Sequence, residues 1–174
     1  VAVSKLHPTS AIRAAYQAGQ RDFGENYAQE LRDKAAELAD LPGLRWHAIG
    51  PLQRNKARYV AGRAALFHAL DRADVASELG RRETRGPLPC LLEVNVAGEA
   101  SKGGVPPDGV EAFLAQVGAI PGIAIRGLMC LPPASDDPEA SRPWFRRLRE
   151  LRDRLVPVGL LSMFRMGDLE LAIE

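Results

Sequence analysis

The stretch VAVSKLHPTSAIRAAYQAGQRDFGEN, residues 1–26, contains one strand, one helix and a second strand. The short apolar run VAVSK (1–5) predicts the first strand, and RDFGEN (21–26) predicts the second. Between them, a Pro-Thr-Ser start signal and the helix-ending Gly19 predict a helix over 10–18. A strand, a helix and a strand in this order are typical of the repeated β-α units that build a parallel sheet.

The same alternation continues along the whole chain. Five further strands are predicted, at 45–50, 65–70, 89–96, 123–131 and 160–164. Seven β-α units without a linker or a break in composition favour one domain, residues 1–174, folded as a TIM-type (β/α) barrel. A closed barrel of this type needs eight strands, so we expect the last strand to lie beyond the end of this sequence. An open sheet is the alternative.

The last long helix is predicted over 138–155. Its apolar face carries Trp144, Phe145, Leu148, Leu151 and Leu155, and arginines and acidic residues occupy most of the rest. Because acidic residues interrupt the basic run, we interpret the charged face as solvated rather than as a nucleic-acid patch.

Composition excludes several classes of partner. The chain has 174 residues, of which 46% are hydrophobic, and its 23 basic and 22 acidic residues nearly cancel. Such a balance gives no global field that would attract nucleic acid or an anionic membrane. No apolar run approaches the roughly 18 residues that cross a bilayer. Cys90 and Cys130 lie in apolar runs without metal or redox spacing, so we expect buried free thiols in a reduced, cytoplasmic compartment. We also expect a monomer.

Lys5 is the first candidate for chemistry. In a barrel, the loops after the carboxyl ends of the strands build the active site, and Lys5 ends the first strand. Alternation places Val1, Val3 and Lys5 on one face, which can be the apolar inner one. There, the cost of desolvating an ammonium group favours the neutral amine that attacks an aldehyde carbon. The alternative is a lysine that extends from a strand end to solvent.

The histidines carry a weaker signal. Alternation in RWHAIG (45–50) places His47 and Ile49 opposite Trp46 and Ala48, and a hydrogen-bonded core histidine is the simpler interpretation. His7, His47 and His68 show no paired spacing with one another or with a carboxylate, so no metal site is expected. No Gly-rich phosphate-binding motif occurs either.

The chain resembles the YggS/PROSC family of pyridoxal phosphate homeostasis proteins, barrels similar to the N-terminal domain of bacterial alanine racemase. The resemblance covers nearly all of the chain. It is carried by VAVSK (1–5), AGQRDFGENYAQEL (18–31), RWHAIGPLQRNKARYV (45–60), LLEVNVAGEASKGG (91–104), RGLMCLPP (126–133) and RPWFRRLRELRDRL (142–155). It implies that Lys5 holds pyridoxal 5'-phosphate (PLP) as a Schiff base. It also implies that Asn26 lies beside the cofactor ring and that His47 lines the same cavity.

Two features depart from the family pattern. Where the family has a Ser-Met-Gly-Met-Ser loop, this chain reads Ser162-Met163-Phe164-Arg165-Met166, so that Met166 replaces a phosphate-binding serine. We expect Ser162, Met163 and Arg165 to contact the cofactor, with Arg165 replacing the lost contact by a charge-assisted bond. The sequence also lacks the family's N-terminal helix and its last strand, of the Arg-Ile-Gly type.

The resemblance implies a protein that stores PLP and delivers it to apo PLP-dependent enzymes, without dedicated catalysis. Two enzyme functions are the alternatives. One is a PLP-dependent amino-acid racemase that uses Lys5 and His47 as bases. The other is a lysine-dependent aldolase that works without a cofactor.

Overall fold

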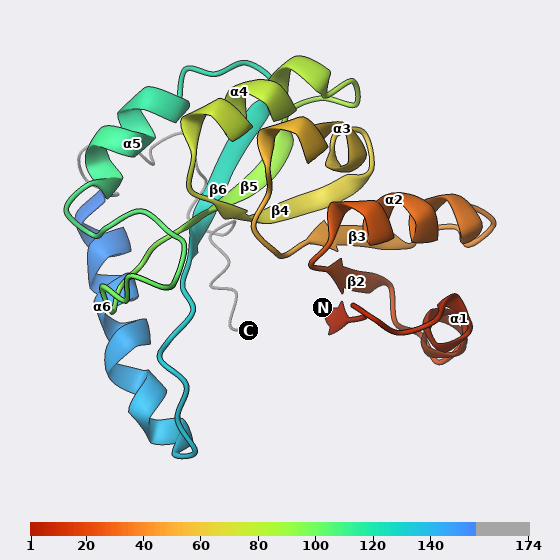
Figure 1. Ribbon diagram of the computed structural model, residues 1–174, viewed down its shortest axis with the longest axis horizontal. Helices are drawn as coiled ribbons and strands as arrows, with labels where there is room; N and C mark the ends of the chain where they lie inside the picture. Colours follow the sequence, from red (N-terminus) through yellow and green to blue (C-terminus); the bar gives the residue numbers. More distant parts are fainter. Residues whose placement is uncertain (156–174) are drawn as a thin grey trace.

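The computed structural model describes residues 1–155. Its six strands form one parallel sheet, in which every strand pairs with the strand that follows it in the chain (Figure 1). The strands are β1 (Ala2–Val3), β2 (Asp22–Glu25), β3 (Arg45–Ala48), β4 (Ala64–Leu70), β5 (Leu88–Glu93) and β6 (Ile123–Met129). Four of them lie within a predicted strand, whereas β4 and β5 each begin one residue earlier than predicted. The seventh prediction, at 160–164, falls outside the described residues.

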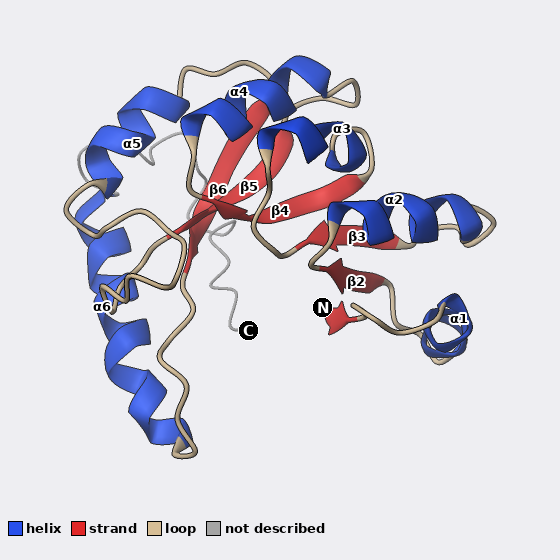
Figure 2. Cartoon of the chain, viewed as in Figure 1, coloured by secondary structure: helices blue, strands red, loops and turns tan. Residues whose placement is uncertain are grey.

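Helices fill the connections and lie along the convex side of the curved sheet (Figure 2). They are α1 (Thr9–Gln17), α2 (Ala28–Glu37), α3 (Ala57–Val60), α4 (Ala73–Arg82), α5 (Val110–Val117) and α6 (Arg142–Leu155), with short 3₁₀ turns η1 (Arg54–Lys56) and η2 (Pro138–Ser141). The strand order never reverses along the described sheet, whereas a doubly wound sheet reverses at its switch point. This one-directional winding is that of the predicted TIM-type (β/α) barrel.

The two faces of the sheet differ in chemistry. On the convex face, the rings of Phe23 and Trp46 pack with their centroids 6.2 Å apart, inside the hydrophobic core that the helices cover. On the concave face, a Cβ on Gly24 would lie 3.1 Å from side-chain atoms of both Val1 and Ile49. The predicted alternation, with Trp46 facing one way and Ile49 the other, is therefore confirmed.

The helix predicted over 138–155 begins later than expected. Residues 138–141 form the 3₁₀ turn η2, in which Asp137 accepts a hydrogen bond from the Glu139 amide, and α6 starts at Arg142. Pro143 explains the difference, because it has no N–H to donate to the carbonyl four residues earlier. Leu148 and Leu151 are buried, as the apolar face predicts.

Two predictions from composition can also be checked. Cys90 and Cys130 are both free and buried, which confirms the prediction. Within residues 1–155, no helix is long and apolar enough to cross a membrane.

Candidate functional site

Lys5 lies two residues after β1, in the turn that follows the strand at the carboxyl edge of the sheet. The Ser4 amide continues the β1 ladder by donating to the Gly24 carbonyl at 2.9 Å. The Ser4 side chain is buried on the convex side, where its hydroxyl donates to Glu25 Oε1 at 2.6 Å. Because side chains alternate along a strand, Lys5 is directed to the opposite, concave face. This is the face and the edge at which a barrel builds its ligand site.

The Lys5 amine is available for chemistry. No hydrogen bond or ion pair holds the Lys5 side chain within residues 1–155, and the residue is exposed. By contrast, Lys34 is buried in ion pairs, and Lys102 donates to the Pro132 carbonyl at 2.7 Å. Lys56 lies in η1, in the connection between β3 and α3. The apolar burial predicted for Lys5 is wrong for the described part of the chain, since the concave face around β1 is open there.

Asn26 directly follows β2 at the same edge of the sheet. Its neighbour across the sheet is Gly50, where an added Cβ would lie only 2.5 Å from the Asn26 carbonyl oxygen. Glycine therefore allows the two loops after β2 and β3 to approach closely. The half-buried Asn26 amide makes no hydrogen bond to the described residues. Its donor and acceptor groups are thus available to a ligand.

His47 lies deeper on the concave face than Lys5. Pairing across the sheet sets Val3 beside Gly24 and Gly24 beside His47, so Lys5 belongs two residues nearer the carboxyl edge. Both ring nitrogens of His47 are occupied. Nε2 lies 3.0 Å from Asp22 Oδ1, and Nδ1 lies 2.9 Å from His68 Nε2. The interpretation of His47 as a hydrogen-bonded core histidine is supported by these contacts.

The direction of this hydrogen-bond chain follows from the charge on Asp22. A hydrogen bond from Arg45, together with one from His47, lowers the pKa of Asp22 to about 2, so its carboxylate accepts from His47 Nε2. His47 Nδ1 then accepts from His68 Nε2, and His68 Nδ1 is left as a buried acceptor without a partner among residues 1–155. Desolvation lowers the pKa of His68 to about 4, so both imidazoles are neutral near pH 7.

Sequence spacing did not reveal this Asp22–His47–His68 chain. The two histidines are 21 residues apart, and they meet because β3 and β4 are adjacent, with a register shift between Trp46 and His47. The only signal in the sequence was side-chain alternation, which directs both His47 and His68 to the concave face of the sheet. No cluster of three or more candidate metal ligands occurs in the described part of the chain.

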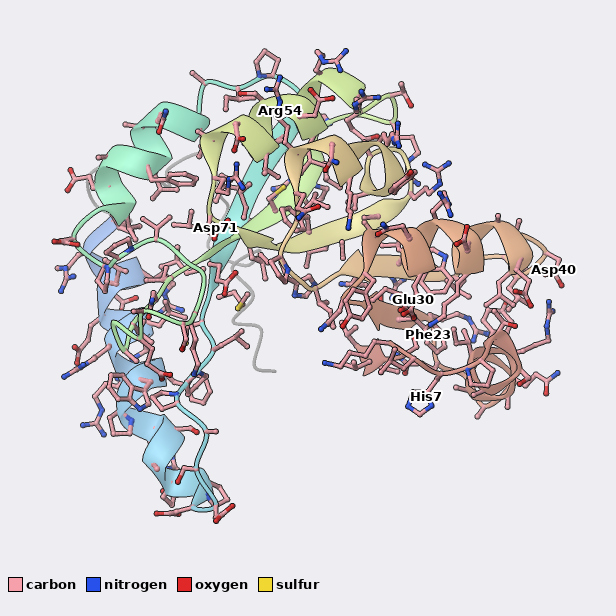
Figure 3. The ribbon with its side chains drawn as sticks, viewed as in Figure 1. His7, Phe23, Glu30, Asp40, Arg54 and Asp71 are labelled. Atoms are coloured by element: carbon pink, nitrogen blue, oxygen red, sulfur yellow. The ribbon has the colours of Figure 1, made fainter. Side chains whose placement is uncertain are left out.

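A second polar cluster lies behind Lys5, on the convex side. Lys34 of α2 donates to Glu25 Oε1 at 2.8 Å, to Glu30 Oε2 at 2.9 Å and to the Ser4 carbonyl at 2.8 Å. Figure 3 shows Glu30 between α2 and β2, beside Phe23. The hydrogen bond from Lys34 holds the pKa of Glu30 below its usual range, whereas desolvation raises that of Glu25. Desolvation opposes the charge on Lys34, but its two carboxylate partners outweigh it and raise the Lys34 pKa.

These observations fit an aldehyde-bearing cofactor on the concave face. The Lys5 amine has no partner among the described residues, and the Asn26 amide has unused donor and acceptor groups. On the other side of the sheet, Lys34 and Glu30 bond the main chain next to Lys5. The other predicted cofactor contacts, Ser162, Met163 and Arg165, lie outside the described residues.

Comparison with known proteins places these features in a family. Residues 1–164 match the family model for the alanine racemase N-terminal domain. The pyridoxal phosphate homeostasis protein of Pseudomonas aeruginosa is 46% identical over 99% of this chain and 76% of its own length. That of Aquifex aeolicus is 42% identical over 98% of this chain and 78% of its own length.

Solved structures show the same fold. PipY of Synechococcus elongatus, solved with PLP bound, matches with a TM-score of 0.84 and 36% identity, covering 97% of this chain and 78% of PipY. Alanine racemase from Corynebacterium glutamicum matches with a TM-score of 0.64 over 88% of this chain and 44% of the racemase. At 16% identity, this second likeness concerns the fold alone.

Proposed function

Since this chain belongs to the family of pyridoxal phosphate homeostasis proteins, we propose that it binds PLP through Lys5 and serves PLP homeostasis by storing and delivering the cofactor. The observation that carries the proposal is the free Lys5 amine at the carboxyl end of β1, in a chain 36% identical to a protein solved with PLP bound. The protein acts as a carrier without dedicated catalysis. The racemase alternative has only a likeness of fold behind it.

Formation of the Schiff base requires only one nucleophilic amine from the protein. When PLP is bound, its aldehyde carbon accepts the Lys5 amine, a carbon–nitrogen double bond forms and water leaves. Water or another amine reverses the step, so the cofactor can pass to an acceptor that binds it more tightly. Lys5 supplies the nucleophile, the Asn26 amide lies beside the ring, and His47 forms part of the cavity wall below them.

The phosphate contacts are part of the same proposal. Ser162, Met163 and Arg165 contact the cofactor, and Arg165 bonds its phosphate in place of the serine that Met166 replaces. Arg165→Ala should then weaken binding of PLP but leave binding of unphosphorylated pyridoxal nearly unchanged in calorimetric titrations. Equal weakening of both ligands would exclude a role for Arg165 in reading the phosphate.

The site assignment is tested by chemical trapping. The protein is loaded with PLP, reduced with borohydride and digested, and the modified peptide is identified by mass spectrometry. The pyridoxyl phosphate mass should lie on the peptide containing Lys5, and Lys5→Ala should lose both the mass and the visible absorption band. Lys56→Ala is the matched control, because Lys56 is half-buried in η1 and should not affect either signal. A label confined to Lys56 or Lys102 would overturn the assignment.

The carrier role is tested by transfer. We propose that the protein acts as a cytoplasmic monomer with apo PLP-dependent enzymes as its acceptors. The loaded protein should restore the activity of an apo PLP-dependent enzyme, and Lys5→Ala should not. Alone, it should leave the optical rotation of L-alanine unchanged. Turnover of an amino acid that disappears in Lys5→Ala would instead favour the racemase.

A further inference from the structure

The buried ion cluster of Glu25, Glu30 and Lys34 has an unusual set of partners. The side chain of Glu25 is fully buried, that of Lys34 is 10% exposed and that of Glu30 is 28% exposed. Burying charges is costly, and apolar residues of similar volume often stabilise a core at least as well as a buried ion pair. The cluster therefore calls for an explanation beyond stability, and its partners suggest one.

Two of these side chains hold the main chain on either side of Lys5. Lys34 Nζ donates to the carbonyl of Ser4, the group that precedes Lys5, at 2.8 Å. Glu30 Oε2 accepts from the amide of Leu6, the group that follows Lys5, at 3.0 Å. Both peptide groups that flank Lys5 are thus fixed by α2. Glu25 joins them, since it accepts from both Lys34 and the Ser4 hydroxyl.

The backbone at this point needs such support. A turn closes from the His7 amide to the Ser4 carbonyl at 3.1 Å, and Leu6 within it has a φ of 62°, in the left-handed region that favours glycine. Leu6 is 78% exposed, so packing of its side chain cannot compensate for this strain. The hydrogen bond from its amide to the Glu30 carboxylate, together with the turn-closing bond to Ser4, offsets the strain.

We propose that Glu30 and Lys34, anchored by Glu25, are positioning residues that hold the main chain of Lys5 so that its amine projects from the concave face at the PLP site. They act from behind the sheet and do not touch the cofactor. This inference rests on the proposed role of Lys5. It adds that the ability of Lys5 to form its covalent bond depends on a helix on the other side of β1.

A comparison of two ligands separates positioning from general stability. PLP can bond covalently to Lys5, whereas pyridoxine 5'-phosphate has an alcohol in place of the aldehyde and cannot. The affinity ratio of the two ligands, from calorimetric titrations, therefore reports the contribution of the Lys5 bond. Glu30→Ala should lower this ratio about tenfold, the loss expected for one charge-assisted hydrogen bond, while pyridoxine 5'-phosphate binds as before.

Two further variants sharpen the test. Glu30→Gln keeps the size and an acceptor oxygen but loses the charge, so it should lower the ratio less, by about threefold. This isosteric variant also serves if Glu30→Ala does not fold. Glu37→Ala is the matched control, because Glu37 lies on the same helix and bonds Thr9 of α1, yet touches neither peptide group beside Lys5. Its ratio should equal that of the unaltered protein.

The outcomes distinguish failure of the positioning role of Glu30 and Lys34 from failure of the proposed PLP binding by Lys5. If the unaltered protein binds both ligands alike and Lys5→Ala changes neither, the Lys5 assignment itself fails. If Lys5→Ala removes the preference for the aldehyde but Glu30→Ala and Glu30→Gln keep it, only the positioning role fails. An equal loss of both ligands in the Glu30 variants assigns the cluster to stability and also overturns the positioning role.

Discussion

The substitution His68→Gln should make the fold less sensitive to acid. His68 is 3% exposed, and desolvation lowers its pKa from 6.5 to about 4. A histidine whose pKa is depressed by folding contributes stability that is complete above its unfolded pKa. That stability is lost as the pH falls from 6.5 toward 4, because the unfolded state binds the proton first. At about 1.4 kcal/mol per pH unit, the full loss is roughly 3 kcal/mol, of which about 2 kcal/mol falls between pH 7 and pH 5.

Glutamine removes the titration but keeps the contact. Its side-chain amide can donate to His47 Nδ1, as His68 Nε2 does now at 2.9 Å. His47 remains and titrates in the same direction, because desolvation lowers its pKa too. Asp22, with a pKa of about 2, loses its contribution only at still lower pH. The difference between the two proteins from about pH 7 to about pH 5 therefore isolates His68.

The assay is urea unfolding, followed by far-ultraviolet circular dichroism at both pH values. The unaltered protein should lose about 2 kcal/mol more than His68→Gln between them. The same loss in both proteins would refute the reasoning, because it would mean that His68 is not held neutral by burial. If acidification instead raised the free energy of unfolding of the unaltered protein, the expected direction of the pH dependence would be wrong.

Three other predictions follow from close packing. Gly50→Ala should destabilise the fold by about 1–3 kcal/mol in urea unfolding, because its Cβ would lie 2.5 Å from the Asn26 carbonyl oxygen. Cys90 and Cys130 should not react with a thiol reagent near pH 8 until urea unfolds the chain, since burial raises the pKa of both thiols, that of Cys130 to about 11. Leu79→Ala, at a fully buried position of α4, should cost about 2–5 kcal/mol by the same unfolding measurement.

The sequence was most informative where a local pattern determines the structure. Each described strand begins within one residue of a predicted start, because period-two alternation and turn residues are local signals. The opposite facing of Trp46 and Ile49 followed from the same rule. The start of α6 was misplaced because the apolar period was followed past Pro143, which a helix interior does not accept.

The polar networks could not be predicted, because they depend on register between separate elements. His47 meets His68 through the shifted pairing of β3 and β4, and no spacing in the chain encodes that shift. Lys34 is nine residues from Glu25 and looks like a solvated helix residue until α2 is packed on β2. The exposure of Lys5 depends on how the barrel closes, and the seventh predicted strand lies outside the described residues.

The two networks lie on opposite faces of the sheet, and this separation allows them to be perturbed independently. The Asp22–His47–His68 chain is on the concave face below Lys5, whereas Glu30 holds the Leu6 amide from the convex side. We therefore expect His68→Gln to change stability against pH but not the preference for PLP over pyridoxine 5'-phosphate at neutral pH. Glu30→Ala should lower that preference but keep the loss of stability that His68 causes between pH 7 and pH 5, because Glu30 bonds Leu6 and Lys34 and does not contact His68. If either variant changed both quantities, the networks would be coupled through β2, the strand that carries both Asp22 and Glu25.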